Sequence, residues 1–244
     1  MENTSLIALS RQGVLRRQMS TVANNIANMN TTGFKSEKMM FVQHLVRSRG
    51  GEGIRGDKIA FVRDVATMRD ISEGPLQATG NPLDIAVRDD GYLVVESGQG
   101  NRYTRNGHLR LDDTGQLVTG QGDRLLSTGD QPFFFSPEDK QINIARDGTV
   151  STENGELGKI KVVRFKNQQQ LRQVGGGMFA TGQPPEDVEK PVIVQGMLEG
   201  SNVNAVFEMT RLIKTQRAYA SIGNFIKRED DRIKTMVKEL AAPV

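Results

Sequence analysis

The stretch "VANNIANMNTTGFK", residues 22–35, closes a helical pattern and thereby divides the chain. Apolar residues recur at helical spacing before it and continue into its first half. Its asparagines and threonines form helices poorly, because their short polar side chains compete for backbone hydrogen bonds. We therefore predict a helix over residues 3–29 that ends at about Asn28 or Met29, with Gly33 permitting the turn that follows.

Both ends of the chain carry apolar stripes of similar period. The N-terminal stripe has residues seven apart and two at the complementary offset: Ala8, Leu15, Val22 and Met29, with Met19 and Ile26. The C-terminal stripe, within residues 201–241, repeats strictly every seven residues: Leu212, Tyr219, Ile226, Ile233 and Leu240. Met209 flanks that line, whereas Gln216, Gly223 and Asp230 weaken it. A seven-residue repeat is typical of helices that pack on helices, so we predict that the terminal helices pair as a coiled-coil-like stem. Ser201 or Asn202 is expected to cap the second helix.

The middle of the chain reads as a connector followed by β-structure. Residues 36–75 contain several glycines and are expected to be irregular or extended. Short apolar or alternating runs then follow, separated by turn dipeptides such as Asp90-Gly91, Asn106-Gly107 and Asp147-Gly148. We predict an α+β fold in which a mainly antiparallel β-domain is inserted between the terminal helices. The expected division is 1–35 (N-terminal helix), 36–75 (extended connector), 76–198 (β-domain) and 199–244 (C-terminal helix).

Composition and motifs give no support for a catalytic or metal site. The 244 residues include no cysteine and two histidines, and the net charge is only +3. No P-loop, zinc-protease or nucleophile-elbow motif is present. Acidic pairs such as Asp112-Asp113 precede turns, where Asp bonds its own backbone, and lack calcium-loop spacing. We therefore expect no enzyme activity, no catalytic residue, no metal and no cofactor.

Partners of other classes are also disfavoured. No stretch approaches the ~20 apolar residues of a membrane helix, and none resembles a cleaved secretion signal, so we expect no membrane insertion and no cleaved signal peptide. The basic residues of the connector are interleaved with acidic ones and have no aromatic ladder, which argues against nucleic acid: Arg47, Arg49, Arg55, Lys58, Arg63 and Arg69.

Five separated motifs resemble the flagellar basal-body rod and hook family. "ANNIANMNTTGFK" (23–35) is similar to its N-terminal signature, and "EGSNVN" (199–204) with "QRAY" (216–219) to its C-terminal one. "TGNPLDIAVRDDGYLVV" (79–95), "RYTRNGHLRLDDTGQLVT" (102–119) and "RDGTV" (146–150) resemble the shared β-domain. The opening "LIALSRQGVLRRQMSTVANNIAN" is most similar to proximal-rod members, with the distal-rod members as the nearest alternative.

The resemblance implies a structural subunit of the rod, the drive shaft that links the motor to the hook. It implies other rod subunits, the distal-rod protein, further copies of itself and the flagellar export apparatus as partners. It also implies a place in the basal body, in the rod that crosses the periplasm. A β-rich module that binds glycan or nucleic acid is a much weaker alternative.

The terminal helices are expected to order on assembly and to build the inner tube of the rod. We predict an assembly interface of fifteen residues: Leu15, Met19, Val22, Asn24, Asn25, Ile26, Asn28, Gly33, Phe34, Met209, Leu212, Gln216, Tyr219, Ile226 and Ile233. The asparagines are expected to bond between subunits and to fix their register. On that hypothesis Asn25→Leu would spare the monomer and damage assembly.

Overall fold

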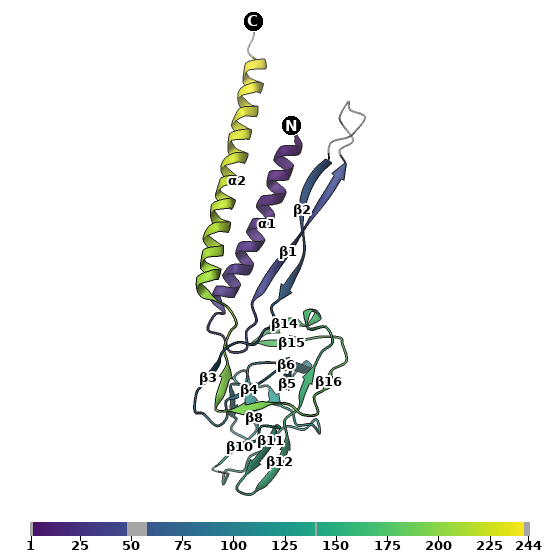
Figure 1. Cartoon of the computed structure of the whole chain (residues 1–244), viewed down its shortest axis with the longest axis vertical. Helices are drawn as coiled ribbons and strands as arrows, with labels where there is room; N and C mark the ends of the chain where they lie inside the picture. The colour runs from purple at the N-terminus through teal and green to yellow at the C-terminus, as the bar shows by residue number, and fades with distance from the viewer. Residues whose placement is uncertain (1, 48–57, 140, 242–244) are drawn as a thin grey trace. The chain divides into compact units, whose positions relative to one another are not determined.

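The computed structural model describes residues 2–47, 58–139 and 141–241, with side chains left undescribed at 2–4, 41–47 and 58–65. The chain forms two compact units, each assembled from separate segments. We call residues 1–27, 37–68 and 204–244 the helical unit, and residues 28–36 and 69–203 the β unit. Figure 1 shows the course of the chain through both.

The helical unit contains two long helices and a two-stranded ribbon. Helix α1 spans Glu2–Ala27 and helix α2 spans Ala205–Leu240, and α1 packs against both α2 and strand β1 (Figure 1). The predicted first helix is confirmed to within two residues, since a turn begins at Asn28. The predicted cap of the second helix is wrong, because the Asn204 side chain accepts a hydrogen bond from the Phe207 amide at 3.2 Å.

The predicted connector contains regular structure. Strands β1 (Glu37–Arg47) and β2 (Lys58–Arg69) pair as a two-stranded sheet, so of the two expected forms, irregular or extended, these residues adopt the extended one. Both strands contain two Val and one Phe, and β2 adds one Ile and one Thr; these residue types suit extended backbone. The glycine-rich residues that suggested irregularity lie at 50–56, outside the described residues.

The β unit consists of short strands joined mostly by tight turns. Its largest sheet has nine strands, and every strand pair in the described residues is antiparallel, as predicted. The elements are β3 Leu76–Ala78, β4 Ile85–Val87, β5 Tyr92–Ser97, β6 Gly100–Thr104, β7 Leu109–Leu111, β8 Leu117–Thr119, β9 Arg124–Leu125, β10 Asn143–Ile144, β11 Thr149–Thr152, β12 Gly155–Lys159, β13 Val162–Arg164, the 3-10 helix η1 Gln168–Gln170, β14 Arg172–Gly175, β15 Met178–Ala180, β16 Glu186–Asp187, β17 Ile193–Gln195 and β18 Met197–Glu199.

Strand β5 is the centre of the β unit. It pairs with β6, β9 and β13. Successive strand residues face opposite sides of a sheet, and here both sides are buried. Leu93 and Val95 belong to one apolar cluster, whereas Tyr92 and Val94 belong to another. The continuous apolar run "YLVV" therefore marks a strand that is covered on both faces.

Turn dipeptides predicted the strand breaks well, although not every predicted glycine adopts a positive φ. Gly148 and Gly155 adopt positive φ in turns, as expected. The pair Asn106-Gly107 does not form such a turn. The carbonyl oxygen of Gly107 instead accepts a hydrogen bond from the Ile85 amide at 3.0 Å, and a Cβ at Gly107 would lie 1.7 Å from the Ile85 carbonyl oxygen. Gly107 is needed because β4 passes too close for a side chain.

We predict that Gly107→Ala destabilises the β unit by about 2–4 kcal/mol, because the backbone of β4 must move to admit the methyl group. Gly98→Ala is the matched control, since a Cβ there would meet nothing within 4 Å. Denaturant unfolding of both variants measures the difference. Equal stability of the two variants would contradict the close approach.

Candidate assembly sites

The face of α2 that turns toward α1 follows a regular alternation of four and three residues. Its members are buried or half-buried: Glu208, Leu212, Thr215, Tyr219, Ile222, Ile226 and Glu229. On α1 the corresponding face comprises Ala8, Gln12, Leu15, Met19, Val22 and Ile26, all buried or half-buried. Such alternation keeps one face of a helix turned toward its partner over several turns.

The flanking positions expected beside the C-terminal stripe differ from those that are buried. The predicted core line through Leu212, Tyr219 and Ile226 does turn toward α1. Its companion positions lie one residue earlier than expected, and the predicted Met209 and Gln216 are exposed. The prediction missed this because Glu208 and Thr215 are polar, yet these two are the buried residues of α2.

The structure divides the remaining predicted residues between the two units. In the helical unit Val22 and Asn25 are buried, Leu15, Met19 and Ile26 are half-buried, and Asn24 and Ile233 are exposed. In the β unit Gly33 and Phe34 are buried and Asn28 is half-buried. The set predicted as one interface is therefore not one continuous surface of either unit.

Asn25 is fully buried and makes its hydrogen bonds within its own chain. Its Oδ1 accepts a hydrogen bond from the Glu37 amide at 2.9 Å, and its Nδ2 donates to the Glu37 carbonyl oxygen at 2.8 Å. Nδ2 also donates to Oε2 of Glu208 at 3.2 Å. One amide side chain therefore joins α1, β1 and α2. The hypothesis that Asn25 is left for a neighbouring subunit is wrong.

Glu208 extends this contact along α2. Its other oxygen, Oε1, accepts a hydrogen bond from Arg211 at 3.1 Å. Both carboxylate oxygens thus have partners, which lowers the cost of burying the charge. Asn25, Glu208 and Glu37 together hold one end of the helical unit, and we call this group the Asn25 node.

In the β unit, the loop after α1 is fixed by a close backbone crossing. Gly33 has a φ of +69°, and a Cβ there would lie 2.7 Å from the carbonyl carbon of Arg105. The Gly33 amide donates to the Glu199 carbonyl oxygen at 2.7 Å. The turn predicted at Gly33 is present, and the structure adds a second reason for glycine there.

Glu199 lies at the centre of a buried ionic cluster in the β unit. Its Oε1 is 2.5 Å from Nζ of Lys35 and accepts from the Gly74 amide at 2.9 Å. Its Oε2 is 3.1 Å from Nη1 of Arg105. All three charged side chains are only 2% exposed. We call Lys35, Arg105 and Glu199 the buried triad.

Further hydrogen bonds surround the triad. Lys35 Nζ donates to the Ser72 carbonyl oxygen at 2.7 Å, and Arg105 donates to the Asp89 carbonyl oxygen. The Asn202 side chain accepts from the Ser36 amide at 2.7 Å and donates to the Asp70 carbonyl oxygen at 3.0 Å. The segments 28–36, 69–75 and 199–203 are therefore tied to one another.

The charge state of Glu199 follows from its surroundings. Burial alone would raise the pKa of its carboxyl, but the charges of Arg105 and Lys35 and the hydrogen bonds from Lys35 and Gly74 outweigh burial. Its pKa is therefore held below the ordinary value. An ionised carboxylate between two buried cations is the arrangement that this cluster requires.

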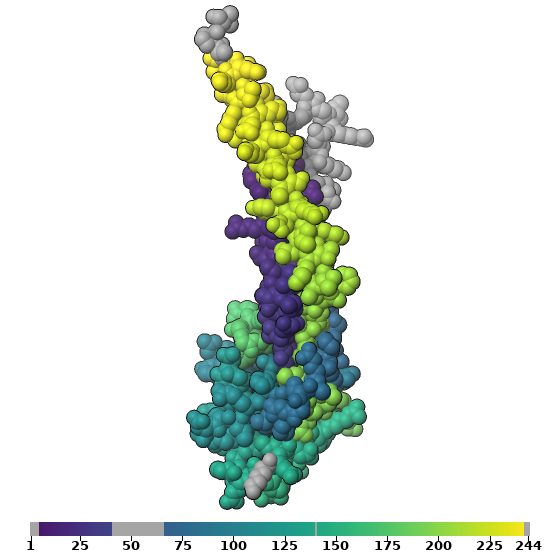
Figure 2. Space-filling view, turned by 90° about the vertical axis from the view of Figure 1, so that its left-hand side faces the viewer, coloured from purple at the N-terminus to yellow at the C-terminus, as the bar shows by residue number. Residues whose placement is uncertain are grey.

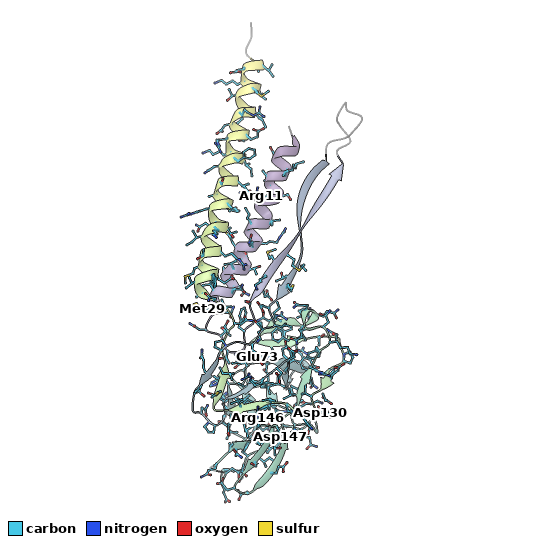
Figure 3. The ribbon with its side chains drawn as sticks, in the orientation of Figure 1. Arg11, Met29, Glu73, Asp130, Arg146 and Asp147 are labelled. Atoms are coloured by element: carbon cyan, nitrogen blue, oxygen red, sulfur yellow. The ribbon has the colours of Figure 1, made fainter. Side chains whose placement is uncertain are left out.

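Residues considered for other chemistry have structural partners. His108 Nδ1 lies 2.7 Å from Oδ1 of Asp84. Asp112 accepts hydrogen bonds from the Gln116 and Thr114 amides and the Thr114 hydroxyl, which lower the pKa of its carboxyl. Asp147, which Figure 3 labels, accepts hydrogen bonds from the amide and the hydroxyl of Thr149 in the turn between β10 and β11.

Among the basic residues of the connector, Arg69 is buried and donates to the Leu171 carbonyl oxygen. The side chains of Arg47, Arg49, Arg55, Lys58 and Arg63 lie outside the described residues. Over the described part of the chain, no three acidic, histidine or cysteine side chains gather as a metal site would require. Neither helix, over its described residues, is both long and apolar enough to span a bilayer.

Three family models match the chain in order. The model described as "Flagella basal body rod protein" matches residues 6–35, "Flagellar hook protein FlgE/F/G D1 domain" matches 86–152, and "Flagellar basal body rod FlgEFG protein C-terminal" matches 194–239. The flagellar basal-body rod protein FlgF of Caulobacter vibrioides is 35% identical over 243 residues, which cover 98% of each chain. The chain belongs to the flagellar basal-body rod protein family.

Other relatives agree with this assignment. FlgF of Mesorhizobium japonicum is 30% identical and covers 97% of this chain and 98% of its own, and FlgG of Bacillus subtilis is 29% identical over 90% and 92%. The chain is thus a structural subunit of the flagellar rod in the basal body, and a FlgF-like assignment is favoured over a FlgG-like one. Asn25 and Lys35 lie in the matched N-terminal segment and Glu37 lies just after it, whereas Glu199 and Glu208 lie in the matched C-terminal segment.

We predict that Asn25→Leu weakens the helical unit, because the amide and carbonyl of Glu37 lose their buried partners. The local opening free energy at the Glu37 amide should fall by about 1–3 kcal/mol. Amide exchange at Glu37 measures it. Asn224→Leu, at an exposed position of α2, is the control and should leave this amide unchanged.

We predict that Glu199→Gln destabilises the β unit by about 3–5 kcal/mol at pH 7, because it leaves Lys35 and Arg105 buried without their counter-charge. Glu96→Gln is the control, since its pair with Arg124 is about half exposed and should be worth less than about 1 kcal/mol. Denaturant unfolding at pH 7 compares the two. Similar losses would contradict a structural role for the triad.

The pH dependence of the same variant has a definite sign. Because the folded pKa of Glu199 is lowered, its contribution is complete above the ordinary carboxyl pKa of about 4.3 and is lost as pH falls through the folded pKa. The wild-type chain should therefore lose more stability than Glu199→Gln does between about pH 5 and about pH 2, the range in which carboxyl groups titrate. Urea unfolding at each pH measures this difference.

Proposed function

We propose that this chain is a proximal-rod subunit that enters the rod through its helical unit. Its neighbours are other proximal-rod subunits, further copies of itself and the distal-rod protein FlgG. It reaches the rod through the flagellar export apparatus, and its place is the part of the rod that crosses the periplasm. The role is structural, as part of the shaft that joins motor to hook.

The observation that supports this proposal is the apolar surface that the helical unit leaves exposed. Helices α1 and α2 already pack on one another, yet large apolar side chains remain outside that contact: Leu6, Leu9, Val206, Phe207, Met209 and Ile213, each between 47% and 73% exposed. An exposed apolar surface of this extent indicates an interaction site. Assembly would cover it.

The proposed interface has two layers. The coiled-coil-like seam, with Leu15, Met19 and Val22 of α1 facing Leu212 and Tyr219 of α2, forms the pair of helices that a subunit contributes to the inner tube. The outer layer comprises predicted residues that stay accessible: Asn24, Met209, Gln216 and Ile233. Ile26 and Ile226 belong to the seam, whereas Asn28, Gly33 and Phe34 act indirectly by shaping the loop that leaves α1.

The helical pair would be only partly ordered before assembly. The buried residues of α2 are Glu208 and Thr215, so this helix gains little from apolar burial within its own chain. The Asn25 node holds one end of the pair. At the opposite ends, residues 5–13 of α1 and 222–240 of α2, Ala8 is the only buried residue, so these segments would become ordered as neighbouring subunits dock.

Amide exchange on the purified monomer tests this ordering. We expect protection near the Asn25 node, at residues 20–27 and 208–215, and fast exchange at residues 5–13 and 228–240. In isolated basal bodies, all four segments should be protected. Uniform strong protection of both helices in the monomer would contradict ordering on assembly.

Deletion of the gene in its host, followed by imaging of basal bodies, tests the position in the rod. Loss of the structure between the rod base and the distal rod supports a proximal subunit. Loss of the distal rod alone would favour the FlgG-like alternative. Normal basal bodies would overturn the proposed function, and restoration by the wild-type chain controls for effects on neighbouring genes.

A further inference from the structure

The β unit contains a recess beside the loop that follows α1. Its volume is about 320 Å³, near the lower end of the roughly 300–1,000 Å³ that is usual for small-ligand sites. Four segments line it: residues 28–34, the segment after β6, the turn between β8 and β9, and the hairpin of β14 and β15 (Figure 1). Figure 2 shows that segments far apart in the sequence, in blue, teal and green, share the surface of this unit. The recess therefore exists only once the β unit has folded.

The lining of the recess is uncharged. Charged residues make up 25% of the chain, yet none of the described residues around the recess carries a charge. Phe34 and Phe179 contact it but are only 7% and 5% exposed. Its polar lining consists of hydroxyl and carboxamide side chains: Asn28, Thr31, Thr32, Asn106, Gln121 and Gln173. An ionised ligand would lose water there without gaining a counter-charge, so a neutral ligand is favoured.

Several of these polar groups can make further hydrogen bonds. Within the described part of the chain, the side-chain carboxamides of Gln121 and Gln173 have no hydrogen-bond partner. The Oδ1 atom of Asn106 accepts from the His108 amide at 3.1 Å, whereas its Nδ2 has no partner among the same residues. A carboxamide both donates and accepts hydrogen bonds, and so does a hydroxyl group. A ligand rich in hydroxyl groups therefore matches this lining.

Contacts within the β unit hold the wall of the recess in place. The hydroxyl of Thr104 donates to the Gly177 carbonyl oxygen at 2.9 Å, which fixes the hairpin of β14 and β15 beside β6. A Cβ at Gly176 would lie 3.2 Å from Cγ of Gln121, so the turn of that hairpin lies against the Gln121 side chain. Because the wall is formed before a ligand arrives, binding requires little rearrangement.

An uncharged peptide is the main competing ligand, because β14 lies at the end of the nine-stranded sheet. Among the described strands, β14 pairs with β15 alone. A peptide that adds to such an edge gains specificity from pockets for alternate side chains. Phe34 and Phe179 are too deeply buried to offer apolar surface to such side chains. The recess therefore suits a saccharide better than a peptide.

We propose that this recess binds a neutral saccharide of mono- or disaccharide size, with the carboxamides of Asn106, Gln121 and Gln173 as hydrogen-bond partners. The inference goes beyond the proposed function and does not depend on it. Gln121 and Gln173 lie in the β unit and are not part of the proposed assembly interface.

A titration of the purified full-length chain, followed by NMR of the side-chain amide groups, tests the site directly. The probes are N,N′-diacetylchitobiose, cellobiose and mannobiose, which are neutral disaccharides with different substituents and linkages. With at least one of them we expect saturable shifts of the side-chain amide signals of Asn106, Gln121 and Gln173. At equal concentration, N-acetylglucosamine should shift these signals more than glucosamine, whose amine is charged, because the recess offers no counter-charge.

Paired variants separate the recess from the rest of the surface. Gln121→Ala combined with Gln173→Ala should weaken binding by about tenfold, because two hydrogen bonds are lost. Gln131→Ala, at an exposed position outside the recess, is the control and should leave the affinity unchanged. Gln121 and Gln173 are also exposed, so denaturant unfolding should give similar midpoints for the wild-type chain and both variants.

Saturable shifts that are confined to the recess and weakened in the double variant support the site. The site is overturned if none of the disaccharides shifts these signals, if the double variant binds as tightly as the control, or if glucosamine binds as well as N-acetylglucosamine. It is equally overturned if an acetylated and amidated tri-alanine peptide binds while the disaccharides do not. Each of these results leaves the proposed function standing, since the gene deletion tests that function separately.

Discussion

The carboxylate of Glu199 is the contact on which the arrangement of the β unit depends. It is buried with Lys35 at 2.5 Å and Arg105 at 3.1 Å, and the Gly74 amide bonds the same side chain. These partners come from the loop after α1, from the segment after β6 and from the segment after β2. A buried carboxylate is stable only with such partners, so the three segments must meet at Glu199 for the charge to be tolerated.

This requirement has consequences for both ends of the chain. Residues 28–36 leave α1 and residues 199–203 lead to α2, and hydrogen bonds from Gly33 to the Glu199 carbonyl and from Asn202 to the Phe34 carbonyl join them. The β unit thus includes the segments that flank both helices. The helices themselves meet in the helical unit, where Asn25 joins α1, α2 and β1. Polar side chains therefore fix both the contact between residues 28–36 and 199–203 and the contact of α1 with α2 and β1.

The sequence predicted what depends on local pattern. The bounds of α1 and the antiparallel strands follow from periodicity, turn residues and apolar runs. The sequence did not predict the contacts that join residues far apart in the chain. Lys35 and Glu199 are 164 positions apart, and nothing in their neighbours marks them as partners. Each lies within a motif that resembles the rod family, but a motif does not reveal which residue its members contact.

The α2 seam illustrates the same limit. The apolar repeat in the sequence places the flanking positions at Met209 and Gln216, whereas Glu208 and Thr215 occupy the inner ones. Glu208 is accommodated because Asn25 and Arg211 bond its two oxygens. Likewise, nothing in the sequence indicates that Asn25 bonds to the backbone of Glu37 in β1, so a contact with a neighbouring subunit was the expectation. Burial of polar groups becomes predictable only when their partners are identified.

A double-mutant cycle between Lys35 and Glu199 tests the central claim most directly. Stability is measured for the wild-type chain, Lys35→Met, Glu199→Gln and the double variant by denaturant unfolding. If the buried pair joins the two segments, the cost of the double variant should fall short of the summed single costs by about 1.5–3 kcal/mol. Costs that add to within about 0.5 kcal/mol would show that the two residues act independently, and would contradict the account.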